Sequence, residues 1–367
     1  MAENTSGDCD VMELSEAVKL ISKNAQDVFI NKEKIKGVAE NVMQHLMKHI
    51  NIFYKLNNNF LRPKSYPYEV NEQPIMVNWL FVLNTLNFSL WYPKNIKQWK
   101  VDGREGYIGL CNAIRRAIEN ETPVWNPEYY ARMTKSELEH ILRSDDGEPD
   151  IPLIDERLKI LHEVGEVLLT KYNGTFLECI KLSDYDADKL MKLLFDEFES
   201  YRDEVIYDGK KVRFLVKARS LVCDMCMYFK NKPSFKLNTS NMMSTIFTDY
   251  CIPQVLFKLE LISYSKRLVK RFANNDEPLE HGSREEIEIR GCSLFAAKEI
   301  CKEVIRISQR HVQENRILKS KKAFNPQVAV DNFLLKFAFI IPKVSGLIEN
   351  DESLKLDPLH YIRSVHY

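Results

Sequence analysis

The chain has 367 residues, which is long enough to bury a sizeable hydrophobic core. Its apolar fraction of 45% and charged fraction of 28% are those of an ordinary globular protein. Lys plus Arg and Asp plus Glu each number 52, so the formal net charge is zero. This balance argues against a protein that grips long DNA or RNA, because such binding uses a basic excess to neutralise phosphates. A local basic pocket for a single phosphate remains compatible with it.

The first residues are polar and acidic, and no basic segment followed by an apolar one indicates a signal peptide. The longest apolar runs, such as Leu80–Leu83 and Phe337–Ile341, are far too short to span a membrane. We therefore expect no membrane partner and a cytoplasmic, or cytoplasmic and nuclear, location. Residues 1–12 are expected to be disordered.

Helical periodicity dominates the chain, as in Leu190, Leu193, Leu194 and Phe198, which share one face. The segments with this periodicity are 14–31, 33–49, 73–91, 106–120, 134–143, 152–171, 185–200, 211–229, 253–271 and 284–312. The sequence predicts an all-α fold forming one compact domain over residues 1–367, with at most a minor β-hairpin around Tyr207–Lys210.

Loops and helix starts follow from local signals. An Asn- and Pro-rich stretch, 57–73, predicts the longest loop, and a second loop is expected over 310–326. Thr134 with Glu137, and Ser283 with Glu286, have the spacing of capping boxes. Pro152 is suited to the first turn of a helix.

Eight cysteines are present, most of them within apolar helical stretches. Cys223 and Cys226 form a CxxC, but a zinc site would need a second ligand pair and none is found in the sequence. We predict reduced core thiols and no metal site.

The segment Val77–Trp91 is almost wholly apolar yet contains several amides and hydroxyls. Such a helix should be buried, and buried amides need hydrogen-bond partners. Two interpretations of these polar side chains stay open: they form hydrogen bonds between helices, or they line the wall of a pocket. In the second, Asn87 offers hydrogen bonds, and Phe88 and Trp91 offer stacking surfaces to a heterocycle.

Asp249 lies between apolar flanks, four residues before Pro253. Pro253 is expected to open a helix and Ile252 to be extended. Asp249 could be an N-cap, or it could be a partly buried catalytic carboxylate with Phe247 and Tyr250 as pocket walls.

Two further charged segments have a structural and a functional reading. Arg290 is expected to pair with a carboxylate of Glu285–Glu288 at a salt-bridged helix start. Near the C-terminus, His360 and Arg363 could face one anion, or belong to a surface tail; the aromatic residues there suggest docking onto the body.

These stretches together resemble the queuosine salvage protein family, the queuosine 5′-phosphate N-glycosylases, over nearly the whole chain. The segments that carry the resemblance are Gln26–Ile30, Val77–Trp79, Thr85–Phe88, Gly106–Tyr107, Leu110–Cys111, Pro127, Tyr129–Tyr130, Ile141–Ser144, Glu156–Arg157, Gly165, Leu168–Leu169, Tyr201–Asp203, Phe247, Asp249–Tyr250, Pro253–Leu256 and Glu288–Leu294. Each is weak alone, and the assignment rests on their order and spacing.

The resemblance implies an all-helical fold similar to the helical DNA glycosylases. It also implies hydrolysis of queuosine 5′-phosphate to queuine and ribose 5-phosphate, without a metal or organic cofactor. Asp249 matches the family's key aspartate and Phe247 its neighbour. Asp331 matches an acidic residue near the queuine, and Lys217 falls in a basic patch that we assign to the phosphate.

The sequence departs from the family at several positions. The family commonly has an aspartate at Asn84, a Lys-Arg pair at Val216-Lys217, an acidic residue at Lys336 and an arginine at Tyr361. The alternatives are therefore a diverged, non-catalytic helical nucleotide-binding or adaptor protein and, from fold analogy alone, a DNA-base glycosylase. The zero net charge argues against the latter.

Overall fold

The computed structural model describes residues 11–48, 73–92, 96–229, 251–273, 278–313, 329–331, 333–334 and 362–367. Their contacts divide the chain into two compact units. Unit 1 comprises residues 1–55, 204–214 and 243–363, and unit 2 comprises residues 56–203, 215–242 and 364–367. Helices dominate both units, which confirms the predicted fold class. The similarity to DNA glycosylases and the single domain stay predictions.

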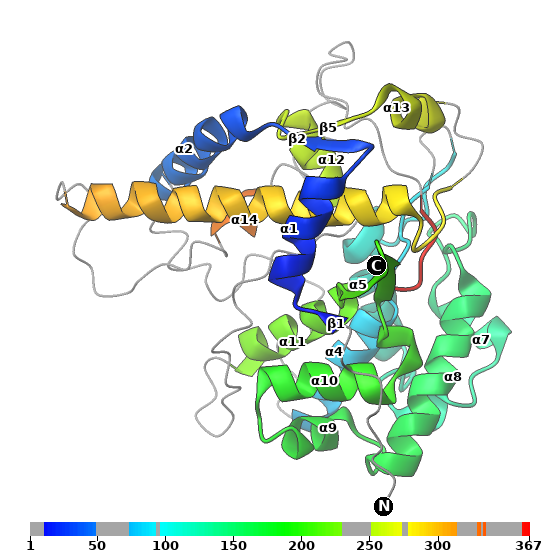
Figure 1. The fold of residues 1–367 in the computed structure, drawn as a ribbon. Coiled ribbons are helices and arrows are strands. Elements are labelled where there is room, and N and C mark those ends of the chain that lie inside the picture. Colours follow the sequence, from blue (N-terminus) through cyan, green and yellow to red (C-terminus); the bar gives the residue numbers. More distant parts are fainter. Residues whose placement is uncertain are drawn as a thin grey trace, which may run out of the picture. The chain divides into compact units, whose positions relative to one another are not determined.

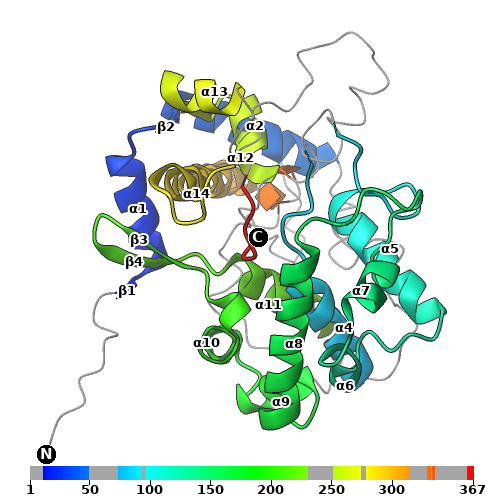
Figure 2. The same ribbon diagram turned by 90° about the vertical axis from the view of Figure 1, so that its right-hand side faces the viewer.

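Unit 1 is built around the long helix α14 (Arg284–Gln313). It packs against α1 (Leu14–Asn24) and α2 (Lys32–Lys48), as Figures 1 and 2 show. The shorter helices α12 (Cys251–Lys258) and α13 (Lys266–Ala273) complete it. Gly291 allows the close approach of α14 to α1, because a Cβ atom there would lie 2.5 Å from Cγ2 of Ile21. The α1–α14 contact therefore requires glycine at this position.

Two small sheets also belong to unit 1. In one, β1 (Val11–Met12) pairs in parallel with β4 (Lys210–Arg213), which pairs in antiparallel fashion with β3 (Glu204–Tyr207). Asp208 and Gly209 join β3 to β4 with φ angles of 46° and 76°. Two consecutive positive φ values are those of a type I′ hairpin turn, for which Asp-Gly is a preferred sequence. The predicted hairpin is therefore confirmed, whereas the expected disorder does not hold for Val11 and Met12.

The second sheet corrects two predicted helices. The periodicity of 14–31 ends in β2 (Val28–Ile30), and that of 253–271 is interrupted by β5 (Ile262–Tyr264), which pairs with β2. Val28 and Ile262 are buried in this pair. Short apolar runs do not distinguish strand from helix by periodicity, and here tertiary pairing decided. Likewise, residues 211–213 of the predicted helix 211–229 form part of β4.

Unit 2 has one large hydrophobic core surrounded by helices (Figure 2). These are α4 (Gln73–Thr85), α5 (Gly106–Glu119), α6 (Pro127–Tyr130), α7 (Lys135–Ile141), α8 (Ile154–Lys171), α9 (Phe176–Leu182), α10 (Ala187–Glu197) and α11 (Val216–Phe229), with the 3₁₀ turn η1 (Glu199–Tyr201). α4 is central to the core because nearly all of its side chains are buried, which explains its lack of an exposed polar face. It packs against α9 and α11.

Several predicted helix ends are confirmed or corrected. Thr134 and Glu137 form the complete capping box of α7. At α14 the Oγ of Ser283 accepts the N–H of Glu286 at 3.4 Å, and Glu286 accepts the N–H of Gly282 rather than that of Ser283. α8 begins at Ile154, two residues after Pro152, and α4 ends at Thr85 rather than at Trp91.

Other predictions fall at the edges of the described residues. α12 begins at Cys251, so Ile252 is helical rather than extended. Pro253 fits there because the N–H groups of a first turn have no partner within the helix. α14 continues to Gln313, into the predicted loop 310–326, whose remainder from 314, like the predicted loop up to residue 72, lies outside the described residues. None of the described helices combines the length and apolar character needed to cross a membrane.

Candidate active site

Lys217 is a buried lysine on the first turn of α11, with a relative exposure of 3%. Its Nζ lies 5.1 Å from the ring centre of Phe88 and 4.9 Å from that of Tyr201, and it donates to the carbonyl oxygen of Thr85 at 3.4 Å. Among the described residues, none of the ion pairs includes this amine. Two aromatic faces and a carbonyl oxygen thus contact the amine, where a buried lysine would ordinarily have a carboxylate as its partner.

The surroundings of Lys217 set its protonation. Burial lowers the pKa of the lysine to about 7, and the positive charge of Arg157 acts in the same direction. The carboxylates of Glu163 and Asp203 oppose this effect only in part. Lys217 therefore gains or loses its proton near neutral pH, and a strongly shifted ionisable group is more frequent at functional sites than elsewhere.

Arg157 holds the loop that carries Phe88. It is fully buried on α8 and donates from its guanidinium to the carbonyl oxygens of Leu86, Phe88 and Pro152. Its guanidinium carbon also lies 4.2 Å from the ring centre of Phe88. The backbone and the ring of Phe88 are thus fixed by one planar cation, whose donors have the fork geometry that such contacts need.

The amides and hydroxyls of α4 make contacts between helices. Asn78 Oδ1 accepts the N–H of Phe176 at 2.8 Å and the hydroxyl of Thr175 at 3.0 Å. Asn84 Nδ2 donates to Oδ2 of Asp224 at 2.9 Å, and Thr85 shares a hydrogen bond of 2.8 Å with Tyr201. These side chains therefore form hydrogen bonds between helices, which is the first of the two interpretations of this segment.

Asn87 and Trp91 follow the end of α4. Asn87 is half-buried, and the described residues include no hydrogen-bond partner for its side chain. Phe88 and Trp91 are buried, with exposures of 1% and 7%. Asn87 thus differs from Asn78 and Asn84, whose amides bond to the protein, and the pocket-wall reading of Asn87, Phe88 and Trp91 stays a prediction.

Unit 1 contains a second set of buried charges, arranged as pairs. Arg290 and Glu286, both fully buried, are 3.1 Å apart, which confirms the predicted pairing of Arg290. The guanidinium carbon of Arg290 lies 4.0 Å from the ring centre of Phe214. Glu288 accepts from the N–H groups of Gln26 and Asp27 and from Nε of Arg284, at 2.9, 2.8 and 2.9 Å.

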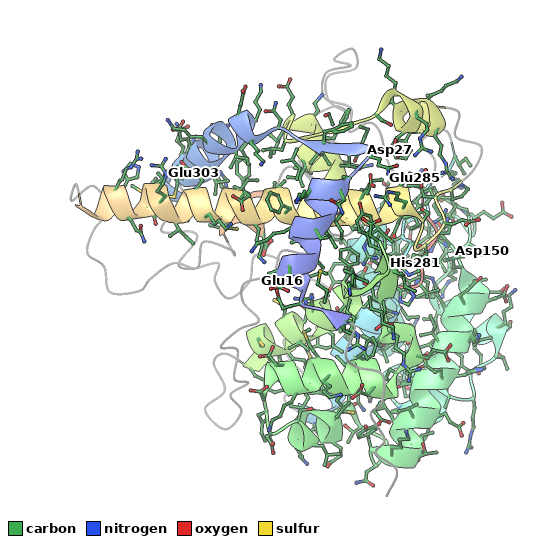
Figure 3. All side chains as sticks on the ribbon, viewed as in Figure 1. Glu16, Asp27, Asp150, His281, Glu285 and Glu303 are labelled. Atoms are coloured by element: carbon green, nitrogen blue, oxygen red, sulfur yellow. The ribbon has the colours of Figure 1, made fainter. Side chains whose placement is uncertain are left out.

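Asp27 extends this paired network at the start of α14, close to Glu285 (Figure 3). Burial would raise the pKa of the Asp27 carboxyl, but hydrogen bonds from Arg267 and Ser265 outweigh it and hold the pKa below its ordinary value. Arg267 also pairs with Glu285 at 2.9 Å. The interpretation of this segment as a salt-bridged helix start accounts for these residues.

Asp331 differs from those paired carboxylates. It is half-buried in unit 1, in a helical segment whose Val330, Phe333 and Leu334 are buried. Burial raises the pKa of Asp331 well above its ordinary value. Its charge in turn raises the pKa of Cys301 on α14, although burial is the larger cause of that shift. No ion pair or hydrogen bond within the described residues includes Asp331.

The predicted site residues are therefore distributed as follows. Phe88 and Lys217 are in contact within unit 2, where Asn87 and Trp91 also lie. Asp331 and the half-buried Arg363 belong to unit 1. Asp249, Phe247, Tyr250 and His360 lie outside the described residues. Residues Ser364–Tyr367 pack within unit 2, so the predicted docking of the C-terminal segment is confirmed for them.

Arg157 and Glu163 were not singled out for a role, although Arg157 was visible in the pattern. On α8 the buried positions are Arg157, Ile160, Leu161, Val164, Gly165 and Leu168, so the arginine interrupts an otherwise apolar stripe. A charged residue on a buried face must be bonded, and this signal could have identified it. The sequence contains no comparable signal for Glu163, because its burial depends on the packing of other elements around it. That burial raises the pKa of the Glu163 carboxyl.

The cysteines are reduced wherever the structure describes them. Cys111, Cys179, Cys292 and Cys301 are buried free thiols, as predicted, and Cys223 and Cys226 on α11 are partly buried. The described part of the chain contains no cluster of three His, Cys, Asp or Glu side chains that could hold a metal ion.

Comparison with known proteins assigns the family. The sequence model described as "Queuosine salvage protein" matches residues 67–367. A Bos taurus protein named queuosine 5′-phosphate N-glycosylase/hydrolase is 34% identical over 96% of this chain and 98% of its own length. Proteins of the same name from Mus musculus and Schizosaccharomyces pombe are each 30% identical, over 96% and 78% of this chain and 98% and 85% of their own lengths. The chain belongs to the queuosine salvage protein family.

Proposed function

We propose that this protein hydrolyses the N-glycosidic bond of queuosine 5′-phosphate. Water replaces the base at C1′ of the ribose, and the products are queuine and ribose 5-phosphate. The released queuine is then available for tRNA modification. The observation that carries this proposal is the match to relatives of that name over nearly the full length of both chains.

Asp249 is the residue that we assign to the chemical step. Cleavage builds positive charge on the ribose, and a fixed carboxylate beside the ring lowers the barrier by electrostatic stabilisation. Asp249 either stabilises that charge and orients water, or attacks the sugar directly as in retaining glycosidases. It precedes α12 by two residues, and the buried Ile252, Val255 and Leu256 anchor that helix.

Asp331 is assigned to the amine of the queuine side chain. Burial disfavours the ionised form of this carboxyl, as its raised pKa indicates. A cationic amine placed against it would favour the ionised form and gain an ion pair largely removed from water. The expected consequence is that Asp331→Asn weakens binding of queuosine 5′-phosphate more than binding of guanosine 5′-phosphate, which lacks the amine.

The base and the phosphate need further contacts. Queuine is a 7-deazaguanine, so it lacks the N7 at which a departing guanine would be protonated. Hydrogen bonds to its other edge must assist its departure, and the half-buried amide of Asn87 suits that role. Phe247, Tyr250, Phe88 and Trp91 are each assigned to the heterocycle as stacking surfaces. Lys217, His360 and Arg363 are assigned to the 5′-phosphate, which positions the sugar.

The decisive experiment compares wild-type protein with Asp249→Asn on queuosine 5′-phosphate and on the unphosphorylated nucleoside, measuring free queuine. Asp249→Asn should fold normally and lose at least about 100-fold in turnover, as expected for removal of a charge-stabilising group. Asp196→Asn, at an exposed position on α10, is the matched control and should retain full activity.

Each outcome has a distinct meaning. Near-normal turnover by Asp249→Asn would refute its assigned role. If the wild-type protein binds the nucleotide but releases no base, the non-catalytic binding protein is the correct reading. Release of bases from duplex DNA instead of from the nucleotide would favour the DNA-base glycosylase.

A further inference from the structure

The segment between α4 and Trp91 has an unusual backbone at Ser89. This residue is fully buried and has a φ of 47°, in the left-handed region that residues other than glycine seldom adopt. Such a conformation persists only where surrounding contacts determine it. Ser89 lies immediately after Phe88 and two residues before Trp91, so its conformation sets the direction of the segment that carries Asn87, Phe88 and Trp91.

Residues 364–367 provide those contacts. The backbone N–H of Ser89 donates to the carbonyl oxygen of Tyr367 at 3.1 Å. Its Oγ donates to the carbonyl oxygen of Ser364 at 2.8 Å and accepts the N–H of the same residue at 3.0 Å. Ser364 and Tyr367 are themselves buried, with exposures of 4% and 3%. The backbone and the side chain of Ser89 are thus both bonded to a segment that lies more than 270 positions away in the sequence.

Arg157 holds the same segment from a different element. It donates to the carbonyl oxygens of Leu86 and Phe88, leaving the N–H and hydroxyl of Ser89 to residues 364–367. Leu86, Phe88 and Ser89 are therefore held by one buried guanidinium and one docked peptide. Neither is an immediate neighbour of the segment in the sequence.

We propose that residues Ser364–Tyr367 are positioning residues for the reaction, acting through Ser89 to hold Asn87, Phe88 and Trp91 in place. The proposal rests on the proposed function, in which these three residues contact the departing base. Misplacement of contact groups by about 1 Å can cost about 100-fold in rate even when the protein stays folded. The bonds of Ser89 should therefore affect turnover more strongly than they affect unfolding.

The test uses three variants of the full-length protein and one control. Removal of residues 364–367 eliminates the hydrogen bonds that Ser89 makes with Ser364 and Tyr367, and Ser89→Ala eliminates those of its hydroxyl. Ser89→Gly also eliminates the hydroxyl contacts but adopts a φ of 47° without strain. Ser183→Ala is the control, because Ser183 is a buried serine of the same unit whose Oγ donates to the carbonyl oxygen of Cys179 at 2.8 Å.

We expect kcat/KM for queuine release to fall by about tenfold or more in all three variants, with a smaller change for Ser183→Ala. The thermal midpoint of Ser89→Gly should stay close to that of the control. Wild-type kcat/KM in the truncated protein would overturn the proposal. So would wild-type kcat/KM in Ser89→Gly alongside a defect in Ser89→Ala, because the backbone angle alone would then matter.

A second measurement separates this proposal from the proposed function. Hydrogen exchange of the amides of residues 86–91 should accelerate when residues 364–367 are removed, whether or not the protein has activity. Unchanged exchange there would refute the positioning role. Absence of queuine release by the wild-type protein, together with accelerated exchange in the truncated one, would instead refute the proposed function.

Discussion

The two units bury their cations in different ways. In unit 1, Arg290 and Glu286 are paired in the interior. The buried carboxylates of Asp27 and Glu288 pair with the exposed Arg267 and the half-buried Arg284. In unit 2, Lys217 and Arg157 face backbone carbonyl oxygens and aromatic rings. The first arrangement gives each of these buried carboxylates a cationic partner. The second leaves a lysine whose pKa has fallen to about 7.

This contrast separates structural charge from functional charge. A paired buried charge contributes to a defined conformation, but its pair can be replaced by apolar residues. A buried lysine without an ion pair has a high energetic cost when protonated. Lys217 is therefore assigned to ligand binding rather than to folding, and three substitutions test the distinction.

The largest effect on stability is expected in unit 1. Arg290→Met removes the buried guanidinium that pairs with the fully buried Glu286, and should lower the free energy of unfolding by about 3–5 kcal/mol in urea titrations. The double variant Arg290→Met with Glu286→Leu should recover much of this loss. Lys192→Ala, which removes an exposed pair with Asp196 on α10, should cost at most about 0.5 kcal/mol. If the double variant were as unstable as the single one, apolar residues could not replace the Arg290–Glu286 pair, and its interpretation as purely structural would be wrong.

An intermediate effect is expected for Arg157→Lys in unit 2. The charge is retained, but an ammonium cannot reproduce the planar fork that reaches the carbonyls of Leu86 and Phe88. Loss of one such charged hydrogen bond should cost about 1.5–3 kcal/mol in the free energy of unfolding. Queuine release should fall by a larger factor than in a control of equal stability. A loss of stability without a loss of turnover would show that Arg157 has a purely structural role, like the paired charges of unit 1.

Measured per pH unit, the smallest effect on stability is expected for Lys217→Met, and it depends on pH. The pKa of Lys217 is about 7 in the folded chain and near 10.4 in the unfolded one, so between these values the unfolded state binds more protons. The free energy of unfolding of the wild-type protein should therefore rise with pH in this window, relative to Lys217→Met, by at most about 1.4 kcal/mol per pH unit. Below pH 7 and above pH 10.4 the difference should be constant.

Parallel stability curves for the two proteins would show that Lys217 keeps its charge throughout. Activity provides a second criterion. If Lys217 binds the 5′-phosphate, Lys217→Met should raise KM for queuosine 5′-phosphate and leave KM for the nucleoside unchanged.

The sequence was sufficient for the helical class and for most helices, because long amphipathic patterns such as that of α8 or α14 have one periodicity. It was insufficient for β2 and β5, whose three-residue strands exist through their pairing with each other. It also placed the end of α4 six residues too late. The apolar run continues to Trp91, but beyond Thr85 the backbone bonds to distant residues instead, to Arg157 and to Ser364 and Tyr367, and no local signal reports these contacts.

The candidate site was less predictable from the sequence than the helices were. The composition of Val77–Trp91 and the isolation of Asp249 between apolar flanks indicated sites, but local patterns left a structural reading open for both. The burial of Lys217 and its proximity to Phe88 and Tyr201 depend on the packing of α11 against α4, which no sequence window contains. The arginine on the buried face of α8 is a local signal for a bonded interior charge, because the other buried positions of that helix are apolar or glycine.

The discontinuity of unit 1 has a consequence for how the protein forms in the cell. α1 and α2 pack on α14, which begins 260 residues after α1 ends, and β1 pairs with β4 about 200 residues further on. At roughly 5–20 residues per second, the ribosome needs on the order of tens of seconds to deliver these partners. During this interval the apolar faces of α1 and α2 are exposed to chaperones and to other nascent chains. Biosynthesis should therefore be sensitive to chaperone supply even where the finished protein is stable.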